Sequence, residues 1–348
     1  MKNRFYPLFL LCALILNAVG AAFADTKVVN KNQSIQLVSL LPASDIVAAF
    51  DTKRLMNDAL PQVLSGNQTL LAKILAHFDE VKNKTGIDLR QFEQAAIGAT
   101  AKQIAPKEFD FDPVILARGQ INAAALIAAA KVAANGKVRE EKMRGKTIYI
   151  FAAKEIAEAN KPRNAAEKNA DMLDKFIGKL SRELAVAAFD ANTLAIGTPL
   201  RVRQTLEAKT RVGTDISNLL TRKPDSILNF AAKLPAGMSA FLPLDNDELG
   251  KNIDSIQYVS GAMNVAGDNT VLQLLAKTQN AAQAQSLLET LQGLQFVGKA
   301  LLGGLKGADK QVYGRMIENA NFSRSTNEVT LDLQVPQNDI NVLIGGIK

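Results

Sequence analysis

Two segments in different halves of this chain resemble each other, and this likeness constrains the fold. The segment ILARGQINAAALIAAA (115–130) resembles LLAKTQNAAQAQSLLETL (274–291). In each, a short apolar run leads through Gln and Asn into a stretch rich in Ala or Leu. Looser likenesses upstream pair 86–100 with 252–267 and 44–55 with 225–237. Internal similarity of this kind predicts that one structural unit is used twice.

Each of these segments predicts a strand followed by a capped helix. The apolar run between Pro113 and Gly119 has the length and the boundaries of a short strand. Asn122 suits the N-cap position, because its side-chain oxygen can accept the free N–H groups of the first turn. The helix after it should end at Asn135–Gly136, a dipeptide typical of a left-handed C-cap. Asn280 has the same place before the second helix.

Both halves close with two strands and a helix. Residues 184–208 predict a hairpin around Asp190–Asn192, with Thr198 and Pro199 at the start of the next helix, and residues 311–344 repeat this pattern. Strands that come as hairpins with helices between them favour an α+β fold over a doubly wound parallel sheet. We therefore expect two related units of mainly antiparallel sheet with helices packed on one face, over residues 25–221 and 222–348.

Two stretches outside the repeats also allow structural predictions. Residues 154–183 are charged and rich in Ala, and they separate the two strand pairs of the first unit. We expect an exposed excursion there, part helix and part loop.

Residues 67–86 predict a helix that ends at Gly86, with one apolar stripe. The stripe contains Leu70, Leu71, Ile74, Leu75, Phe78 and Val81.

The beginning of the chain indicates the compartment. A basic start and an apolar run (residues 8–19) precede Ala22–Phe23–Ala24, an A-x-A cleavage site. This order predicts a secretory signal peptide over residues 1–24, because the apolar core is shorter than the ~20 residues that span a membrane. Cys12, the single cysteine, would leave with it, so the mature protein would hold no disulfide and no Cys-ligated zinc. A membrane anchor and lipidation of Cys12 are the alternatives.

A resemblance points to the same compartment. The segments LLPASDIVAAFDTKRLMNDALPQVL (40–64) and LAVAAFDANTLAIGTP (184–199) resemble uncharacterised exported bacterial proteins. The mature domains of those proteins open with a Leu-Pro-Ala strand-and-helix unit and include a hairpin that ends in a glycine. The resemblance implies a bacterial envelope setting, in the periplasm or outside the cell, and supplies no catalytic residues.

Motifs for catalysis and for metal or nucleotide binding are incomplete. His77 is the single histidine, and no G-x-S-x-G or S-x-x-K motif accompanies it. GLQFVGKA (293–300) approaches a phosphate loop, but Ala300 stands where a hydroxyl should hold Mg²⁺. LDNDELGKNI (244–253) echoes part of an EF-hand but lacks the third ligand, so a solvated turn is expected. The chain has no Trp, and no basic run is interleaved with aromatics, so we expect no nucleic-acid binding.

The glycine-punctuated segment 291–310 is the most distinctive functional candidate. With Lys299, Lys306 and Lys310, its apolar side chains suit a membrane interface or a hydrophobic ligand. Packing within its own domain is the competing interpretation, since glycine weakens an isolated helix. The candidate contact residues are Leu294, Phe296, Val297, Leu301, Leu302 and Leu305.

These features predict an exported, non-enzymatic binding or scaffolding protein of the bacterial cell envelope, without a cofactor or a metal. Loss of Lys2 and Arg4 would lower the formal charge from +7 to +5, which suits a protein or an anionic polymer as partner and is compatible with peripheral membrane contact. A solvated surface of mixed charge is the competing interpretation, because Lys and Arg are scattered among Asp and Glu. A carrier of lipid or another hydrophobic ligand, with 291–310 as lid or membrane contact, is the alternative. A hydrolase that uses carboxylates alone is the third interpretation.

Overall fold

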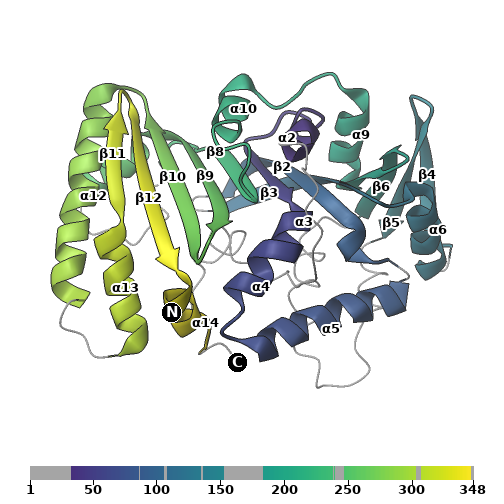
Figure 1. The fold of residues 1–348 in the computed structure, drawn as a ribbon. Helices are drawn as coiled ribbons and strands as arrows, with labels where there is room; N and C mark the ends of the chain where they lie inside the picture. Colours follow the sequence, from purple (N-terminus) through teal and green to yellow (C-terminus); the bar gives the residue numbers. More distant parts are fainter. Residues whose placement is uncertain are drawn as a thin grey trace. The chain divides into compact units, whose positions relative to one another are not determined.

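The computed structural model describes residues 33–85, 87–105, 108–134, 136–152, 183–237, 239, 247–302 and 307–345. The predicted signal peptide (1–24) and nearly all of the charged segment 154–183 lie outside these residues. The described chain is mixed α+β with antiparallel strands, as the sequence predicts (Figure 1). It divides into two compact units, which we call the α12 unit (residues 53–77 and 218–348) and the α6 unit (residues 32–52 and 78–217).

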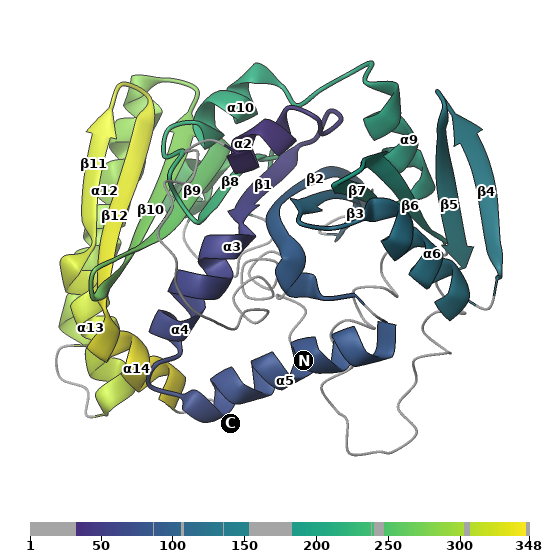
Figure 2. The same ribbon diagram turned by 45° about the vertical axis from the view of Figure 1, so that its right-hand side comes forward.

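The α12 unit contains an antiparallel sheet whose strands lie side by side in Figure 2 in the order β8-β9-β10-β12-β11. These strands are β8 (Leu228–Lys233), β9 (Ile256–Ala266), β10 (Asn269–Thr278), β11 (Asn321–Ser325) and β12 (Glu328–Pro336). The accompanying helical elements are η1 (Leu55–Ala59), α4 (Leu60–Val63), α11 (Asp247–Asp254), α12 (Ala281–Leu302), α13 (Ala308–Asn319) and α14 (Gln337–Gly345).

One face of this sheet carries two core clusters of the unit. Side chains alternate along a strand, so Leu272 and Ala276 of β10 share a face. Leu272 packs in a cluster with Ala59 of η1, and Ala276 packs in a cluster with Leu287 of α12. Helices η1 and α12 therefore cover two parts of the same apolar face.

The strands of the α6 unit are also antiparallel and follow the order β1-β2-β3-β7-β6-β5-β4. Its strands are β1 (Ile46–Asp51), β2 (Phe92–Ala105), β3 (Glu108–Gly119), β4 (Val138–Met143), β5 (Lys146–Ala152), β6 (Glu183–Asp190) and β7 (Thr193–Gly197). Its helices include α2 (Gln33–Val38), α6 (Ala123–Ala133) and α9 (Pro199–Glu207).

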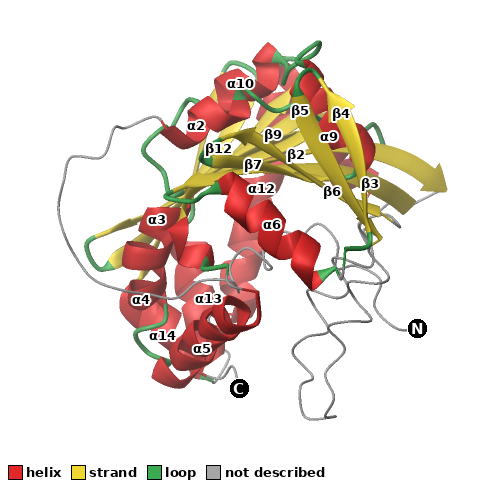
Figure 3. Cartoon of the chain, turned by 90° about the vertical axis from the view of Figure 1, so that its right-hand side faces the viewer, coloured by secondary structure: helices red, strands yellow, loops and turns green. Residues whose placement is uncertain are grey.

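Helices cover both faces of the sheet in the α6 unit, so the prediction of helices on one face is wrong there. Helix α6 packs against Val186 and Leu194. The alternate residues Ala185, Ala187 and Ala195 point to the other face, where they are buried and where α9 packs on β6 and β7. Figure 3 shows α6 in front of the strands and α9 behind them. Both faces need a cover because both sets of alternating side chains are apolar.

Local predictions from capping residues are confirmed. The Asn122 side chain accepts a hydrogen bond from the Ala125 N–H, and the Asn280 side chain accepts one from the Gln283 N–H, each at 3.0 Å. After α6, Gly136 has φ +73°, the left-handed conformation expected of a C-cap. The strand, cap and helix thus recur in both units. The full internal duplication, with its boundary between 221 and 222, stays a prediction.

The long helix predicted after residue 67 is also confirmed. Helix α5 spans Gln68–Thr85, and Leu71 and Phe78 from its apolar stripe are buried. Its remaining stripe residues are half-buried. Most of this helix is therefore structural, as its pattern indicates.

Candidate functional site

Helix α12 contains most of the sequence segment chosen as the functional candidate. Its first half packs on the sheet beside β10, β11 and β12, and Ala284 and Leu287 are buried next to Val329. The sequence explains this side, because small and branched side chains recur at helical spacing. The first half of α12 is therefore part of the core.

The second half of α12 is held by α13. The Gln295 side-chain amide donates hydrogen bonds to the carbonyl oxygens of Ile317 and Ala320, each at 2.7 Å. Gly298 permits a close approach, since a Cβ there would be 3.2 Å from Cδ1 of Ile317. These contacts fix which side of α12 is packed and which side points away.

The side that points away is apolar. Leu294 is 49% exposed, Val297 51% and Leu301 68%, and their i, i+3, i+7 spacing places them on one face. Phe296, about 100° around the helix from Val297, is 76% exposed. We call these four residues the α12 apolar face. Of the other two predicted contact residues, Leu302 is half-buried and Leu305 lies outside the described residues.

The outward side of α12 changes character halfway along the helix. In the first half it carries exposed Gln285 and Glu289, whose side chains share a 2.7 Å hydrogen bond. One helical turn further on, the same stripe continues with Gly293 and Phe296. The helix is thus packed on one side throughout and is apolar on its outer side only in the second half.

Cationic side chains accompany the α12 apolar face. Lys299 is exposed, and within the part of the chain that the structure describes it has no hydrogen bond or ion pair. The sequence has no carboxylate between Glu289 and Asp309. On α13, Lys310 is exposed and Tyr313 follows one turn later, about half exposed. An apolar surface flanked by lysine is typical of a peripheral membrane contact.

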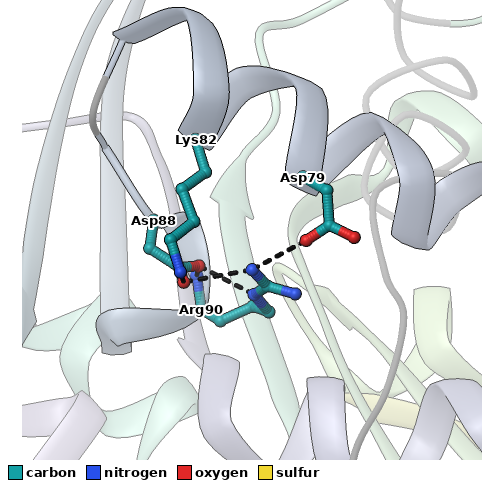
Figure 4. Close-up of polar contacts among 4 residues, drawn as sticks. All are labelled: Asp79, Lys82, Asp88 and Arg90. Carbon is teal, nitrogen blue, oxygen red and sulfur yellow. Dashed lines mark hydrogen bonds and ion pairs between the residues drawn. The ribbon is translucent and has the colours of Figure 1, made fainter.

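A charged network joins α5 to the 3-10 turn η2 (Leu89–Gln91), as Figure 4 shows. The Arg90 guanidinium lies 2.7 Å from Asp88 and 2.9 Å from Asp79, and Lys82 lies 3.0 Å from Asp88. Hydrogen bonds from Arg90 and then Lys82 hold the pKa of Asp88 well below its usual value, although burial opposes this. A general acid must keep its proton near neutral pH. This carboxylate pair therefore suits a structural role better than a hydrolytic one.

Sequence reasoning missed a buried arginine. Arg201 of α9 is 2% exposed, and it donates hydrogen bonds to the Ala43 carbonyl at 2.8 Å and to the Ser44 hydroxyl at 2.5 Å. Burial lowers the pKa of Arg201, and the charges of Asp112 and Asp45 oppose this. No sequence signal marks this position, because its partners lie far away along the chain. The contact ties α9 to the segment before β1.

Other weak motifs have structural explanations. Residues 293–300 lie inside α12, so they form no phosphate loop. Residues 247–254 form α11, so the turn expected there is wrong for this part of 244–253. His77 is exposed on α5. Among the described residues, no group of three or more His, Cys, Asp or Glu side chains could hold a metal ion. No described helix is both long and apolar enough to cross a membrane.

Comparisons with known proteins give structural similarity only. No family model matches the chain, and no curated protein matches it. Among solved structures it is similar to crystal form III of TP0453, with 11% identity, TM-score 0.44 and coverage of 88% of this chain and 97% of that one. Crystal form I gives 10% identity, TM-score 0.41 and coverage of 88% and 95%. Crystal form IV gives 8% identity, TM-score 0.42 and coverage of 89% of this chain and 96% of that one. At these values the similarity assigns no function.

Proposed function

We propose that this protein is an exported, non-enzymatic binding protein of the bacterial cell envelope that attaches to a lipid surface through the α12 apolar face. The exposure of Leu294, Phe296, Val297 and Leu301 on one side of a packed helix carries the proposal. Large exposed apolar patches on proteins mark sites of interaction with other proteins, membranes or ligands.

The energy available from this surface fits reversible attachment. Complete burial of a large apolar side chain contributes about 1.5–3 kcal/mol. These side chains are already about a quarter to a half covered, so each would contribute roughly 1–2 kcal/mol on entering lipid. A total of roughly 4–8 kcal/mol corresponds to dissociation constants from about millimolar to micromolar. Such a contact is peripheral and reversible.

Residues elsewhere in the chain support the setting and the absence of catalysis. The basic start, apolar run and Ala22–Phe23–Ala24 site support export. After loss of residues 1–24 no thiol would be left, and the single histidine is exposed on α5. The carboxylates of Asp79 and Asp88 are paired with two cations, Arg90 and Lys82. These observations favour a binding protein over an enzyme.

Flotation with phospholipid vesicles tests the lipid contact. The wild-type protein should float, and the double variant Phe296→Asp, Leu301→Asp should stay at the bottom of the gradient. Val132→Asp is the matched control, because Val132 is a 78% exposed apolar residue on α6. It should float like the wild type.

Two results would overturn the proposal. One is a wild-type protein that does not float with vesicles of any headgroup. The other is a dimer in light scattering that the double variant converts to a monomer, since the α12 apolar face would then be an interface between copies. Lipid extracted in a fixed ratio from protein that does not float would indicate a carrier instead.

A further inference from the structure

We infer that the lipid surface bound by the α12 apolar face carries anionic headgroups, and that Lys299 supplies the selectivity. The inference rests on the proposed lipid contact. It adds the class of lipid, which apolar side chains alone do not distinguish.

The position of Lys299 relates it to the inserting side chains. It lies one helical turn after Phe296 on α12, so the two side chains are neighbours, and Lys299 lies on the far side of Phe296 from Leu294, Val297 and Leu301. A lysine in this position can lay its aliphatic stem along apolar groups and hold its ammonium group at headgroup level. A helix lying in the interface would therefore place this charge among phosphates.

Lys299 is available for such a contact. Some other cations of the protein are engaged by carboxylates: Lys131 lies 2.6 Å from Glu140, and Arg222 lies 2.7 Å from Glu328. For Lys299, no ion pair occurs within the described residues. The second half of α12 contains no acidic residue, so no charge of its own helix half opposes it.

Helix α13 adds a weaker second cation. Lys310 shares its side of α13 with Gly314, where a Cβ would be 3.9 Å from Leu302 of α12. This side of α13 is therefore next to the second half of α12. Asp309 precedes Lys310 and offsets part of its charge. A substitution at Lys299 therefore tests the preference for anionic lipid better than one at Lys310.

The expected effect follows from surface electrostatics. One lysine near an anionic membrane changes affinity about fivefold, the equivalent of about 1 kcal/mol. Apolar insertion by a single element gives marginal binding, and a second signal decides which membrane is occupied. Charge reversal at Lys299 should therefore reduce binding to anionic vesicles roughly 10- to 25-fold.

The experiment measures partition of the full protein onto phosphatidylcholine vesicles with and without phosphatidylglycerol, at low and high salt. Wild type should prefer the anionic vesicles at low salt and lose that preference at high salt. The Lys299→Glu variant should show no preference for anionic vesicles at either salt concentration. The control is Lys142→Glu, because Lys142 is exposed on β4, and this variant should behave like the wild type.

The outcomes separate this inference from the proposed function. Equal wild-type binding to both vesicles, or a Lys299→Glu result equal to that of Lys142→Glu, overturns the inference. If Phe296→Asp, Leu301→Asp still abolishes binding in that case, the proposed lipid contact survives. If wild type binds neither vesicle, both fail together.

Discussion

Gly298 of α12 lies against Ile317 of α13, so that a Cβ on Gly298 would be only 3.2 Å from the Ile317 side chain. This approach, with the hydrogen bonds from Gln295, orients the second half of α12. The orientation of the α12 apolar face is therefore fixed in the folded protein before any partner binds.

Enlarging Gly298 should disturb this contact. Gly298→Leu should lower the free energy of unfolding by about 1–3 kcal/mol, because the added side chain must displace Ile317. Gly293→Leu is the matched control, since a Cβ at Gly293 meets nothing within 4 Å. Urea unfolding of both variants checks the prediction. Equal stability of the two would show that α13 does not pack on Gly298.

The network around Asp88 should give the protein an acid-sensitive stability. The pKa of Asp88 is lowered in the folded state, so its contribution is present above the unfolded value of about 3.9 and is lost as the pH falls below it. Asp88→Asn should cost about 1–2 kcal/mol at neutral pH and flatten the dependence of unfolding free energy on pH below about 4.

Asp58→Asn is the control for this measurement. Asp58 lies 3.8 Å from Arg54 and its side chain is about half exposed, so a much smaller effect is expected. Urea unfolding at a series of pH values compares the two variants. Parallel curves for wild type and Asp88→Asn would contradict the assignment.

Arg201 should be a structural residue of the α6 unit. Arg201→Met should reduce stability by about 2–4 kcal/mol, because it leaves the Ser44 hydroxyl and the Ala43 carbonyl buried without their donor. Arg203→Met on the same helix removes a partly exposed pair with Glu141 and should cost less than about 1 kcal/mol. Thermal unfolding of both variants gives the comparison, and a reversed order would refute the role of Arg201.

The Asn280 cap should stabilise the start of α12. Asn280→Ala should cost about 0.5–2 kcal/mol, because the Gln283 N–H loses its acceptor. Asn280→Asp keeps an acceptor and should retain most of the stability. Hydrogen exchange of the first turn of α12 is the measurement, and unchanged protection in Asn280→Ala would show that the cap contributes nothing.

The features predicted correctly from the sequence are local ones. Asn122 and Asn280 were identifiable as caps because the groups that they bind lie three residues away. The hairpin around Asp190 follows from a polar turn between two apolar runs. In such cases the chemistry that decides the structure is contained in a short window.

The features that were missed depend on distant partners. Arg201 is separated from Ser44 by 157 residues, and no local pattern marks a buried arginine. The positions of α6 and α9 on opposite faces depend on which strands become neighbours. For the candidate site, the sequence indicated six apolar side chains, but the packing of α13 determines which of them stay exposed.

The change halfway along α12 has a consequence for how the protein leaves its binding partner. Only about ten residues of helix, roughly 15 Å, offer an apolar outer side. Gln285 and Glu289 would keep the adjoining stretch hydrated. A molecule attached by so short a stretch would be extracted by washing with concentrated salt or alkaline buffer, without detergent, and would return to solution with its fold intact.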